Sequence, residues 1–327
     1  MTSITSELAS EERANLIRRL SLVPGLKYLD SATHAMLWLG DIEKLKVTNL
    51  LSTFTESCLY KPTLKAWLAR SQRRNEPPQP TDLVSPTAAP NTPQKRNFRD
   101  SSRSPSKPPR LKKRSNPAKD IVNERDGGRC VITKMSEPIQ VCHIYPFALG
   151  SKPKSERESF WRLLGCFWTS ETIAKWKESI IHSEDIDIPP NSEAPQNVLC
   201  LSTIVHVLWA SARLAFEPVK LSEDQTSLTM RFWWLPLRTF SKHVDLRVAP
   251  FLPSDLRASP LNAKLWNRET DEPIYSGHLM TLTTRDPESM PLPSFDLLQM
   301  QWTLNRIAAL AGAADVIDEE FEPDFES

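Results

Sequence analysis

Three short stretches decide how we interpret this 327-residue chain: Cys130-Val131-Ile132-Thr133, Val141-Cys142-His143-Ile144-Tyr145-Pro146, and Asn197-Val198-Leu199-Cys200-Leu201-Ser202, which is followed by His206. The first two stretches are apolar and lie between turn-forming residues, which predicts a hairpin with strands at 129–133 and 139–144. Ser202 is a suitable N-cap, so a helix is expected over residues 203–215. The sequence thus places His, Asn and His, in that order, around one predicted β-β-helix unit.

A helical insertion is expected between the predicted hairpin and Asn197. Its large apolar side chains recur at near-helical spacing, a pattern typical of core packing. These side chains are Phe160, Trp161, Leu163, Leu164, Phe167, Trp168, Ile173, Trp176 and Ile180. His182 follows in a polar stretch, and we interpret it as a surface histidine.

The regions on either side complete the predicted organisation. Residues 1–72 suggest helices at 7–20, 32–39, 42–60 and from Pro62, with Trp38 and Trp67 facing a core or a partner. Residues 221–314 predict a strand at 227–235, a strand or hairpin arm at 273–284 and an amphipathic helix at 295–311. The tail at 315–327 is acidic and contains no Lys or Arg. We assign no chemistry to the N-terminal region.

Residues 73–118 have the composition of a disordered linker. They contain 10 prolines, and 11 Lys and Arg against 3 Asp and Glu, a net charge of +8. Such a segment cannot bury enough apolar surface to offset chain entropy. Its basic residues suit a nuclear import signal or a phosphate-binding arm, although a solvated linker without either role has the same composition. The candidate nucleic-acid-binding residues are Lys95, Arg96, Arg110, Lys112, Lys113 and Arg114.

Cysteine usage and hydropathy indicate an intracellular, soluble protein. The five cysteines include no pair at the C-x-x-C spacing, which predicts neither a disulfide framework nor a zinc ribbon. No apolar run approaches the roughly 20 residues that a membrane span needs, and the N-terminus lacks a secretory pattern. We expect no membrane partner, and the oligomeric state is left open.

The His143, Asn197 and His206 pattern resembles the HNH nucleases, whose ββα-metal site cleaves phosphodiesters with one divalent ion. The likeness extends over about residues 120–314 to the HNH-domain proteins of fungal genomes. It rests on Arg125-Asp126 before the hairpin, the aromatic insertion, His206-Val207-Leu208-Trp209, and Gln301-Trp302 in the C-terminal helix. The resemblance implies that His143 is the general base, Asn197 ties the loop and orients that histidine, and His206 is a metal ligand.

Two positions depart from the family pattern. Many members carry an acidic residue or a histidine directly before the base, where this chain has Cys142, a thiolate ligand suited to zinc rather than magnesium. Many also carry a second ligand one helical turn after the helix histidine, where this chain has Ala210. We treat Cys142 as a candidate second ligand. Glu124, Asp126 and Asp185 are acidic residues that folding would have to bring near.

The expected fold is α+β: a ββα-metal (HNH) core at 119–220 with a helical insertion, a C-terminal extension at 221–314, and a helical N-terminal region. The expected function is endonuclease cleavage of nucleic acid, with DNA as the expected substrate and Mg²⁺, Mn²⁺ or Zn²⁺ as the cofactor. The alternative is a catalytically inactive module that uses the same fold to bind nucleic acid or protein. A nuclear location is a further possibility raised by the linker.

Overall fold

The structure is a computed structural model that describes residues 4–24, 26–47, 60–68, 117–180 and 194–313. Several predicted features lie outside the described residues: nearly all of the basic linker, the acidic tail, His182 and Asp185. The six predicted nucleic-acid-binding residues lie outside them as well, namely Lys95, Arg96, Arg110, Lys112, Lys113 and Arg114.

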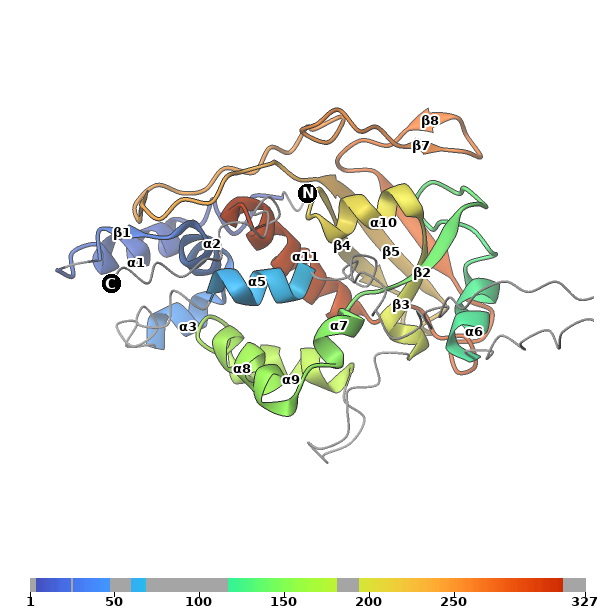
Figure 1. Ribbon diagram of the computed structural model, residues 1–327, viewed down its shortest axis with the longest axis horizontal. Coiled ribbons are helices and arrows are strands. Elements are labelled where there is room, and N and C mark those ends of the chain that lie inside the picture. Colours follow the sequence, from blue (N-terminus) through green and yellow to red (C-terminus); the bar gives the residue numbers. More distant parts are fainter. Residues whose placement is uncertain (1–3, 25, 48–59, 69–116, 181–193, 314–327) are drawn as a thin grey trace, which may run out of the picture.

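The described chain is an α+β fold with small antiparallel sheets (Figure 1). Its helices are α1 (Glu11–Leu20), α2 (Ser31–Leu39), α3 (Ile42–Val47), α5 (Tyr60–Leu68), α6 (Pro117–Arg125), α7 (Phe147–Gly150), α8 (Lys154–Leu164), α9 (Ser170–Glu178), η4 (Pro195–Asn197), α10 (Thr203–Ala210) and α11 (Phe295–Ala311). Its strands are β1 (Tyr28–Leu29), β2 (Ile139–His143), β3 (Val198–Ser202), β4 (Leu214–Leu221), β5 (Ser227–Trp234), β6 (Val244–Asp245), β7 (Trp266–Asn267), β8 (Glu272–Pro273) and β9 (Leu279–Thr283).

Helix α11 lies at the centre of the fold, where it packs mainly against β4 on one side and α2 on the other (Figure 1). We expected an amphipathic helix, but every residue from Leu297 to Ala311 except the half-buried Gln299 is buried. A helix that is enclosed on all sides does not need a polar stripe. Its few buried polar side chains, including Gln301 and Asn305, must therefore find hydrogen-bond partners inside the protein.

Asn305 joins three segments through its side-chain amide. Its Oδ1 accepts from Trp67 Nε1 at 2.9 Å, and its Nδ2 donates to the carbonyls of Trp209 and Leu214, both at 3.2 Å. Helix α5, the end of α10 and the start of β4 are thus all tied to α11. The buried apolar side chains around this amide form one continuous cluster from the N-terminal helices to the C-terminal helix.

The N-terminal segment is also fixed to α11 by a buried guanidinium. Arg306 donates to the Glu7 carboxylate at 2.8 and 2.9 Å and to the carbonyl of Ile4 at 3.3 Å. Ser31, at the start of α2, donates to the carbonyl of Ala311 at 2.7 Å. The N-terminal helices therefore share the core of the later residues.

The predicted strand at 129–133 is wrong, because this stretch forms a turn. The N–H of Cys130 donates to the carbonyl of Met135 at 2.8 Å, and Gly127 and Gly128 before it have positive φ angles of 66° and 65°. The chain thus curls back before it reaches β2. The antiparallel partner of β2 is instead β3, with Val141 opposite Cys200. The sequence unit is therefore strand, insertion, strand and helix.

The predicted helix at 203–215 is too long. It ends at Ala210, because Ala212 adopts the left-handed conformation with φ of 48° and residues 214–221 continue as β4. Pro218 lies within β4 at a register shift, a position where a missing N–H is tolerated. The Ser202 N-cap is confirmed, as its side chain accepts from Val205 N–H.

The predicted strand at 227–235 and helix at 295–311 are confirmed as β5 and α11, and the aromatic insertion is buried as expected.

We predict that Glu7→Gln lowers stability at neutral pH and that this loss disappears in acid. Burial acts to raise the pKa of Glu7, but the Arg306 guanidinium outweighs it, so the pKa lies below its ordinary value. The ion pair then contributes above the unfolded pKa of about 4.3, and its contribution is lost as the pH falls through the lower folded value. Because Glu7 is 32% exposed, we expect about 2 kcal/mol rather than the roughly 3–5 of a fully buried pair.

Urea unfolding of both proteins between pH 3 and pH 7 measures this difference, with exposed Glu11→Gln as the charge-matched control. A difference between wild type and Glu7→Gln that persists at pH 3 would contradict the assignment.

Candidate functional site

The β2–β3 sheet brings His143 and Asn197 to the same end of one strand pair. His143 is the last residue of β2 and lies opposite Val198, the first residue of β3, and Asn197 directly precedes Val198. Helix α10 follows β3 without a loop, so His206 is held close to the same sheet. The fold therefore brings together His143 and Asn197, which are 54 positions apart, whereas His206 lies against Gln140.

Asn197 clamps the backbone immediately after His143. Its Oδ1 accepts from Tyr145 N–H at 2.7 Å, and its Nδ2 donates to the Tyr145 carbonyl at 3.2 Å. The carbonyl of Asn197 also accepts from Ile144 N–H at 2.7 Å. The side chain is fully buried, where losing any of these bonds is costly. The backbone that follows β2 is thus fixed at Ile144 and Tyr145, the two residues after His143.

Tyr145 anchors this corner in the aromatic insertion. Its ring stacks on Trp161 with centroids 6.0 Å apart and an interplanar angle of 2°. Burial raises the pKa of its hydroxyl well above the ordinary value, so the ring remains a neutral phenol. Half-buried His143 itself lies next to the ring of Phe147, with centroids 5.6 Å apart. The histidine is therefore held between a fixed backbone and an aromatic neighbour.

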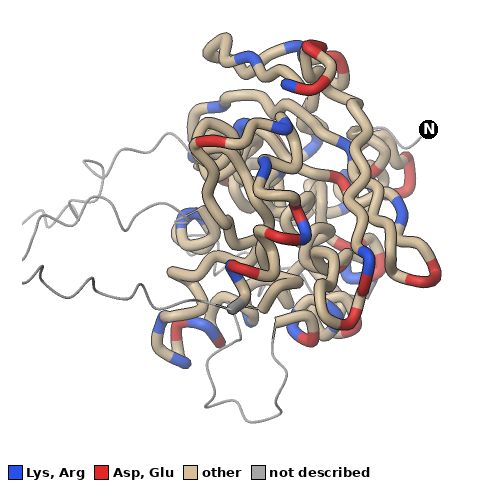
Figure 2. Tube along the Cα trace, turned by 90° about the vertical axis from the view of Figure 1, so that its right-hand side faces the viewer, with Lys and Arg blue, Asp and Glu red and all other residues tan. Residues whose placement is uncertain are grey.

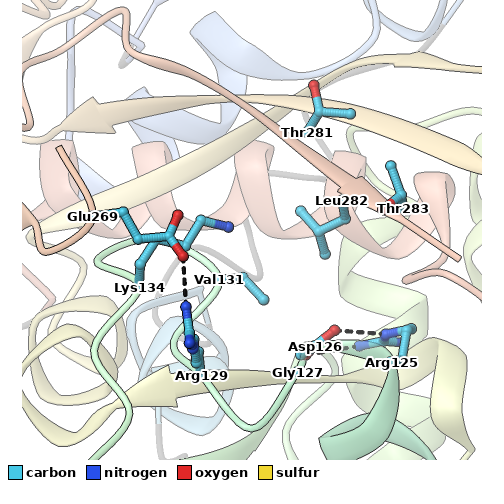
Figure 3. Close-up of a pocket in the computed structure, with 10 residues that line it drawn as sticks. All are labelled: Arg125, Asp126, Gly127, Arg129, Val131, Lys134, Glu269, Thr281, Leu282 and Thr283. Carbon is cyan, nitrogen blue, oxygen red and sulfur yellow. Dashed lines mark hydrogen bonds and ion pairs between the residues drawn. The ribbon is translucent and has the colours of Figure 1, made fainter.

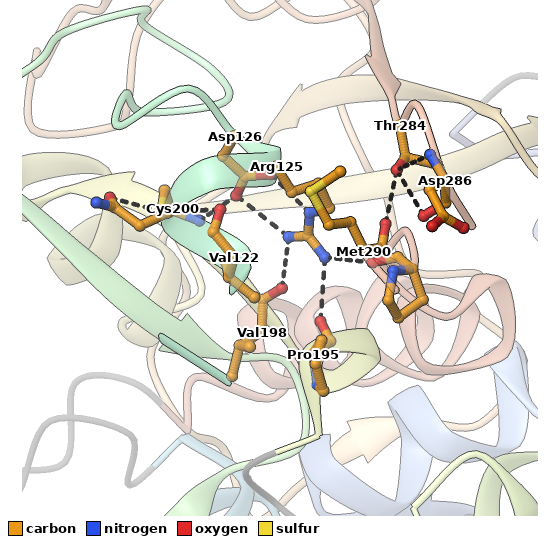
Figure 4. A network of polar contacts seen from close by, with 11 residues as sticks. Val122, Arg125, Asp126, Pro195, Val198, Cys200, Thr284, Asp286 and Met290 are labelled. Atoms are coloured by element: carbon orange, nitrogen blue, oxygen red, sulfur yellow. Dashed lines mark hydrogen bonds and ion pairs between the residues drawn. The ribbon is translucent and has the colours of Figure 1, made fainter. Parts of the chain in front are cut away.

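The buried Arg125–Asp126 ion pair binds backbone carbonyls of the segment that enters β3 (Figure 4). The guanidinium of Arg125 contacts the Asp126 carboxylate at 2.8 Å and donates to the carbonyls of Pro195 at 3.1 Å and Val198 at 2.8 Å. These two carbonyls flank Asn197. Arg125 also donates to the carbonyl of Pro291 at 2.8 Å, which ties the turn to the segment before α11. The loop that carries Asn197 is thus bound from both ends.

Asp126 extends the same support into β3. Its carboxylate accepts from Cys200 N–H at 2.8 Å, and burial together with Asp126 raises the pKa of the Cys200 thiol to about 12. Cys200 is therefore a protonated, structural thiol rather than a nucleophile. Asp126 has a side chain that is 2% exposed and fully engaged in this network, so it does not act as the metal ligand that we considered from sequence.

His206 is oriented by a residue that sequence reasoning missed. Its Nδ1 lies 2.7 Å from Gln140 Oε1 on β2. Because an amide oxygen only accepts, Nδ1 carries the proton, and the lone pair of the neutral ring is on Nε2. Metal-binding histidines are commonly oriented in this way by a bond to the second ring nitrogen. No sequence signal marked Gln140, since the contact spans 66 positions.

Among the residues that it describes, the structure supplies no other ligand at Cys142 and Ala210, the two positions that depart from the family pattern. Alternation along β2 puts Cys142 on the face of Gln140, and thus of His206, whereas His143 shares the other face with Val141. Cys142 is buried, with its thiol donating to the carbonyl of Gln140 at 3.3 Å. Ala210, also buried, adds no donor one turn after His206. His206 is thus the only oriented donor that we identify on this face of the described sheet.

These residues do not fit a complete centre for a divalent ion. Within the described residues, no group of three or more His, Cys, Asp or Glu side chains is placed to hold a metal ion. A catalytic zinc site uses about three protein ligands, and a magnesium site uses at least one carboxylate. Glu124, another acidic candidate, is exposed on α6.

Charged residues of both signs are distributed along the described chain. Figure 2 shows Lys and Arg interspersed with Asp and Glu, without a continuous basic stripe on the face in view. Proteins that contact several phosphates concentrate their positive charge. None of the described helices is long and apolar enough to cross a membrane.

An antiparallel strand pair followed by a helix thus carries all three residues: His143 and Asn197 at one end of the strand pair, and His206 on the helix beside Gln140. Residues 130–217 match a family model described as HNH endonuclease, and the match spans β2, the insertion, β3 and α10. It supports an HNH nuclease domain in this part of the chain. The chain matched no curated protein and no solved structure.

We predict that Asn197→Ala destabilises the protein by about 2–4 kcal/mol, because two buried backbone groups of Tyr145 lose their partner. Asn197→Asp should cost at least as much, since a carboxylate would face the Tyr145 carbonyl. Denaturant unfolding measures both changes. Gln196→Ala, which alters the half-buried neighbour, is the matched control and should stay within about 0.5 kcal/mol of wild type. Equal stability of Asn197→Ala and the control would refute the clamp.

Proposed function

We propose that this chain is an endonuclease that hydrolyses phosphodiester bonds of nucleic acid, with DNA as its substrate. The observation that carries the proposal is the fixed corner at His143, where Asn197 binds both backbone groups of Tyr145 inside the segment that matches the HNH endonuclease model. Such a corner suits a general base, which must stay within hydrogen-bond reach of the water that it activates.

In this proposal His143 removes a proton from the attacking water. The neutral form of an imidazole has a ring nitrogen lone pair that can accept that proton. Asn197 is a positioning residue that acts through the Tyr145 backbone. HNH domains generally use a divalent metal ion, which supplies charge neutralisation at the phosphate. His206 would hold that ion, and Cys142 is the candidate second ligand on the same face of β2.

A second candidate function is favoured by the incomplete donor set. Buried Cys142 and Ala210 stand where the family carries ligands, and the described residues hold no three-donor cluster. An inactive module would keep the HNH fold and bind nucleic acid or protein without cleavage. The two candidates make opposite predictions for plasmid cleavage.

We predict metal-dependent nicking of supercoiled plasmid by the full chain with Mg²⁺, Mn²⁺ or Zn²⁺. The full chain is required because the N-terminal helices share the core with α11. His143→Ala should lower the rate by about 10²–10⁴, the usual contribution of a general base. His206→Ala should abolish the metal-dependent nicking, and exposed His243→Ala is the control that leaves the rate unchanged.

Nicking that survives unchanged in His143→Ala would overturn the assignment of the base. A folded wild-type protein that nicks with none of the three ions, yet binds DNA in a filter assay, would favour the inactive module.

We further propose that the basic linker binds phosphate groups of the nucleic acid and directs the protein to the nucleus. Replacing Lys95, Arg96, Arg110, Lys112, Lys113 and Arg114 with Gln should weaken DNA binding, because each substitution takes away a positive charge that neutralises phosphate. The slope of log Kd against log salt should fall by about 0.9 for each phosphate no longer neutralised. Fluorescence anisotropy at several salt concentrations measures it, and a slope equal to that of wild type would remove the linker from the binding surface.

A further inference from the structure

A polar slot opens between the edge strand β9 and the turn that precedes β2 (Figure 3). Its volume is about 430 Å³. One wall is the β9 segment Thr281–Thr283, and the other is the turn from Gly127 to Lys134. The slot is separate from His143 and His206, neither of which lines it.

The register of β9 shows which of its backbone groups point into the slot. Beyond the two ends of the ladder, Thr284 N–H donates to the Thr226 carbonyl at 2.9 Å and Phe232 N–H donates to the His278 carbonyl at 2.8 Å. Hydrogen-bonded pairs alternate with non-bonded pairs in antiparallel sheets. The pairs Leu282–Leu228 and Met280–Met230 are therefore the bonded ones.

Thr281 and Thr283 consequently direct their N–H and C=O groups away from β5. Within the part of the chain that the structure describes, β9 is the outer strand of the β4–β5–β9 sheet, and these outward groups have no hydrogen-bond partner. Met280 and Leu282 bury their side chains in the core, so the strand is firmly held while its edge stays open. An open edge with two donors and two acceptors is a template for a further strand.

The opposite wall leaves space for such a strand. Gly127 has a φ of 66°, and a Cβ atom added there would meet no atom within 4 Å. Lys134 also lies in the left-handed region, with a φ of 58°. Glycine at 127 is thus explained by its backbone conformation and not by tight packing, and the turn does not close onto β9.

The charges around the slot favour an acidic occupant. Arg125 is paired with Asp126, and Arg129 with Glu269 at 2.6 Å. Among the described residues that line the slot, Lys134 is the cation without an ion-pair partner. An incoming carboxylate would complete that charge balance.

We propose that β9 is a docking site for an extended peptide of a partner protein, which adds as a strand beside Thr281 and Thr283 and places an acidic side chain at Lys134. Alternating donors and acceptors on one edge match a peptide backbone. A nucleic-acid backbone offers acceptors only, so it leaves the two carbonyls unpaired. The proposal is independent of nuclease activity.

The test begins with a random heptapeptide display library selected on the immobilised full chain. Selected peptides should be enriched in Asp or Glu and in β-branched residues. Their synthetic forms should bind in fluorescence anisotropy and should slow hydrogen exchange at the amides of Thr281 and Thr283. Lys134→Asn keeps a residue that tolerates the left-handed conformation and should weaken binding about three- to tenfold, whereas Lys220→Asn on β4 should not.

Thr281→Pro removes an outward N–H without touching the bonds from β9 to β5, and proline is accepted at such edge positions. It should weaken peptide binding about tenfold. Thr281→Val keeps the N–H and is the matched control, with binding within about twofold of wild type. Thr283→Pro supplies the same test if Thr281→Pro does not fold by circular dichroism.

Four outcomes would overturn the proposal. The first is the absence of an enriched peptide, and the second is equal binding by Thr281→Pro and Thr281→Val. The third is complete displacement of the peptide by a 15-nucleotide single strand that binds wild type but not Lys134→Asn, which would assign the slot to nucleic acid. Peptide binding that appears only after removal of residues 314–327 would instead assign the slot to the acidic tail of this chain.

Discussion

The amide of Asn305 is the interaction on which the rest of the fold depends. It lies on the buried helix α11, where a polar group without partners is costly, and it binds the indole of Trp67 and the carbonyls of Trp209 and Leu214. No apolar side chain of similar size could satisfy these three groups. The fold thus requires α5, α10 and β4 to meet at one point on α11, and this requirement fixes where α10 ends.

The side-chain amides of Asn305 and Asn197 hold the candidate site from two sides. Asn305 fixes the C-terminal end of α10, and Asn197 fixes the chain that leaves β2, so His206 and His143 are positioned from opposite directions. The Arg125–Asp126 pair adds a third support by binding the carbonyls on both sides of Asn197. Buried ion pairs are weak evidence for stability, because desolvation offsets much of their attraction. Their specific geometry is better explained as the means of holding the turn at Asn197.

Sequence reasoning succeeded where structure depends on nearby residues and failed where it depends on distant ones. The Ser202 cap, β5 and α11 follow from local patterns, and the structure contains all three. The stretch Cys130–Thr133 has a strand-like composition, yet it turns because its bonds go to Met135 and to Cys200, which is 69 positions from Val131. The same limit hid the contact of Gln140 with His206 and the backbone contacts of Arg125, which span 66 to 166 positions.

The residues that support the candidate site are fully hydrogen-bonded, whereas the donors that could bind a metal ion are few. Burying an ion pair and an amide around one turn costs free energy unless every bond is made, and here Arg125, Asp126 and Asn197 each have several partners. The positions that would bind an ion are, by contrast, a buried thiol and a methyl group. The activity of a histidine general base depends on where its ring is held, whereas the binding of a metal ion depends on how many donor atoms surround it. The geometry at His143 is therefore the stronger part of the nuclease proposal, and the metal requirement is the part that chemistry at Cys142 and Ala210 weakens.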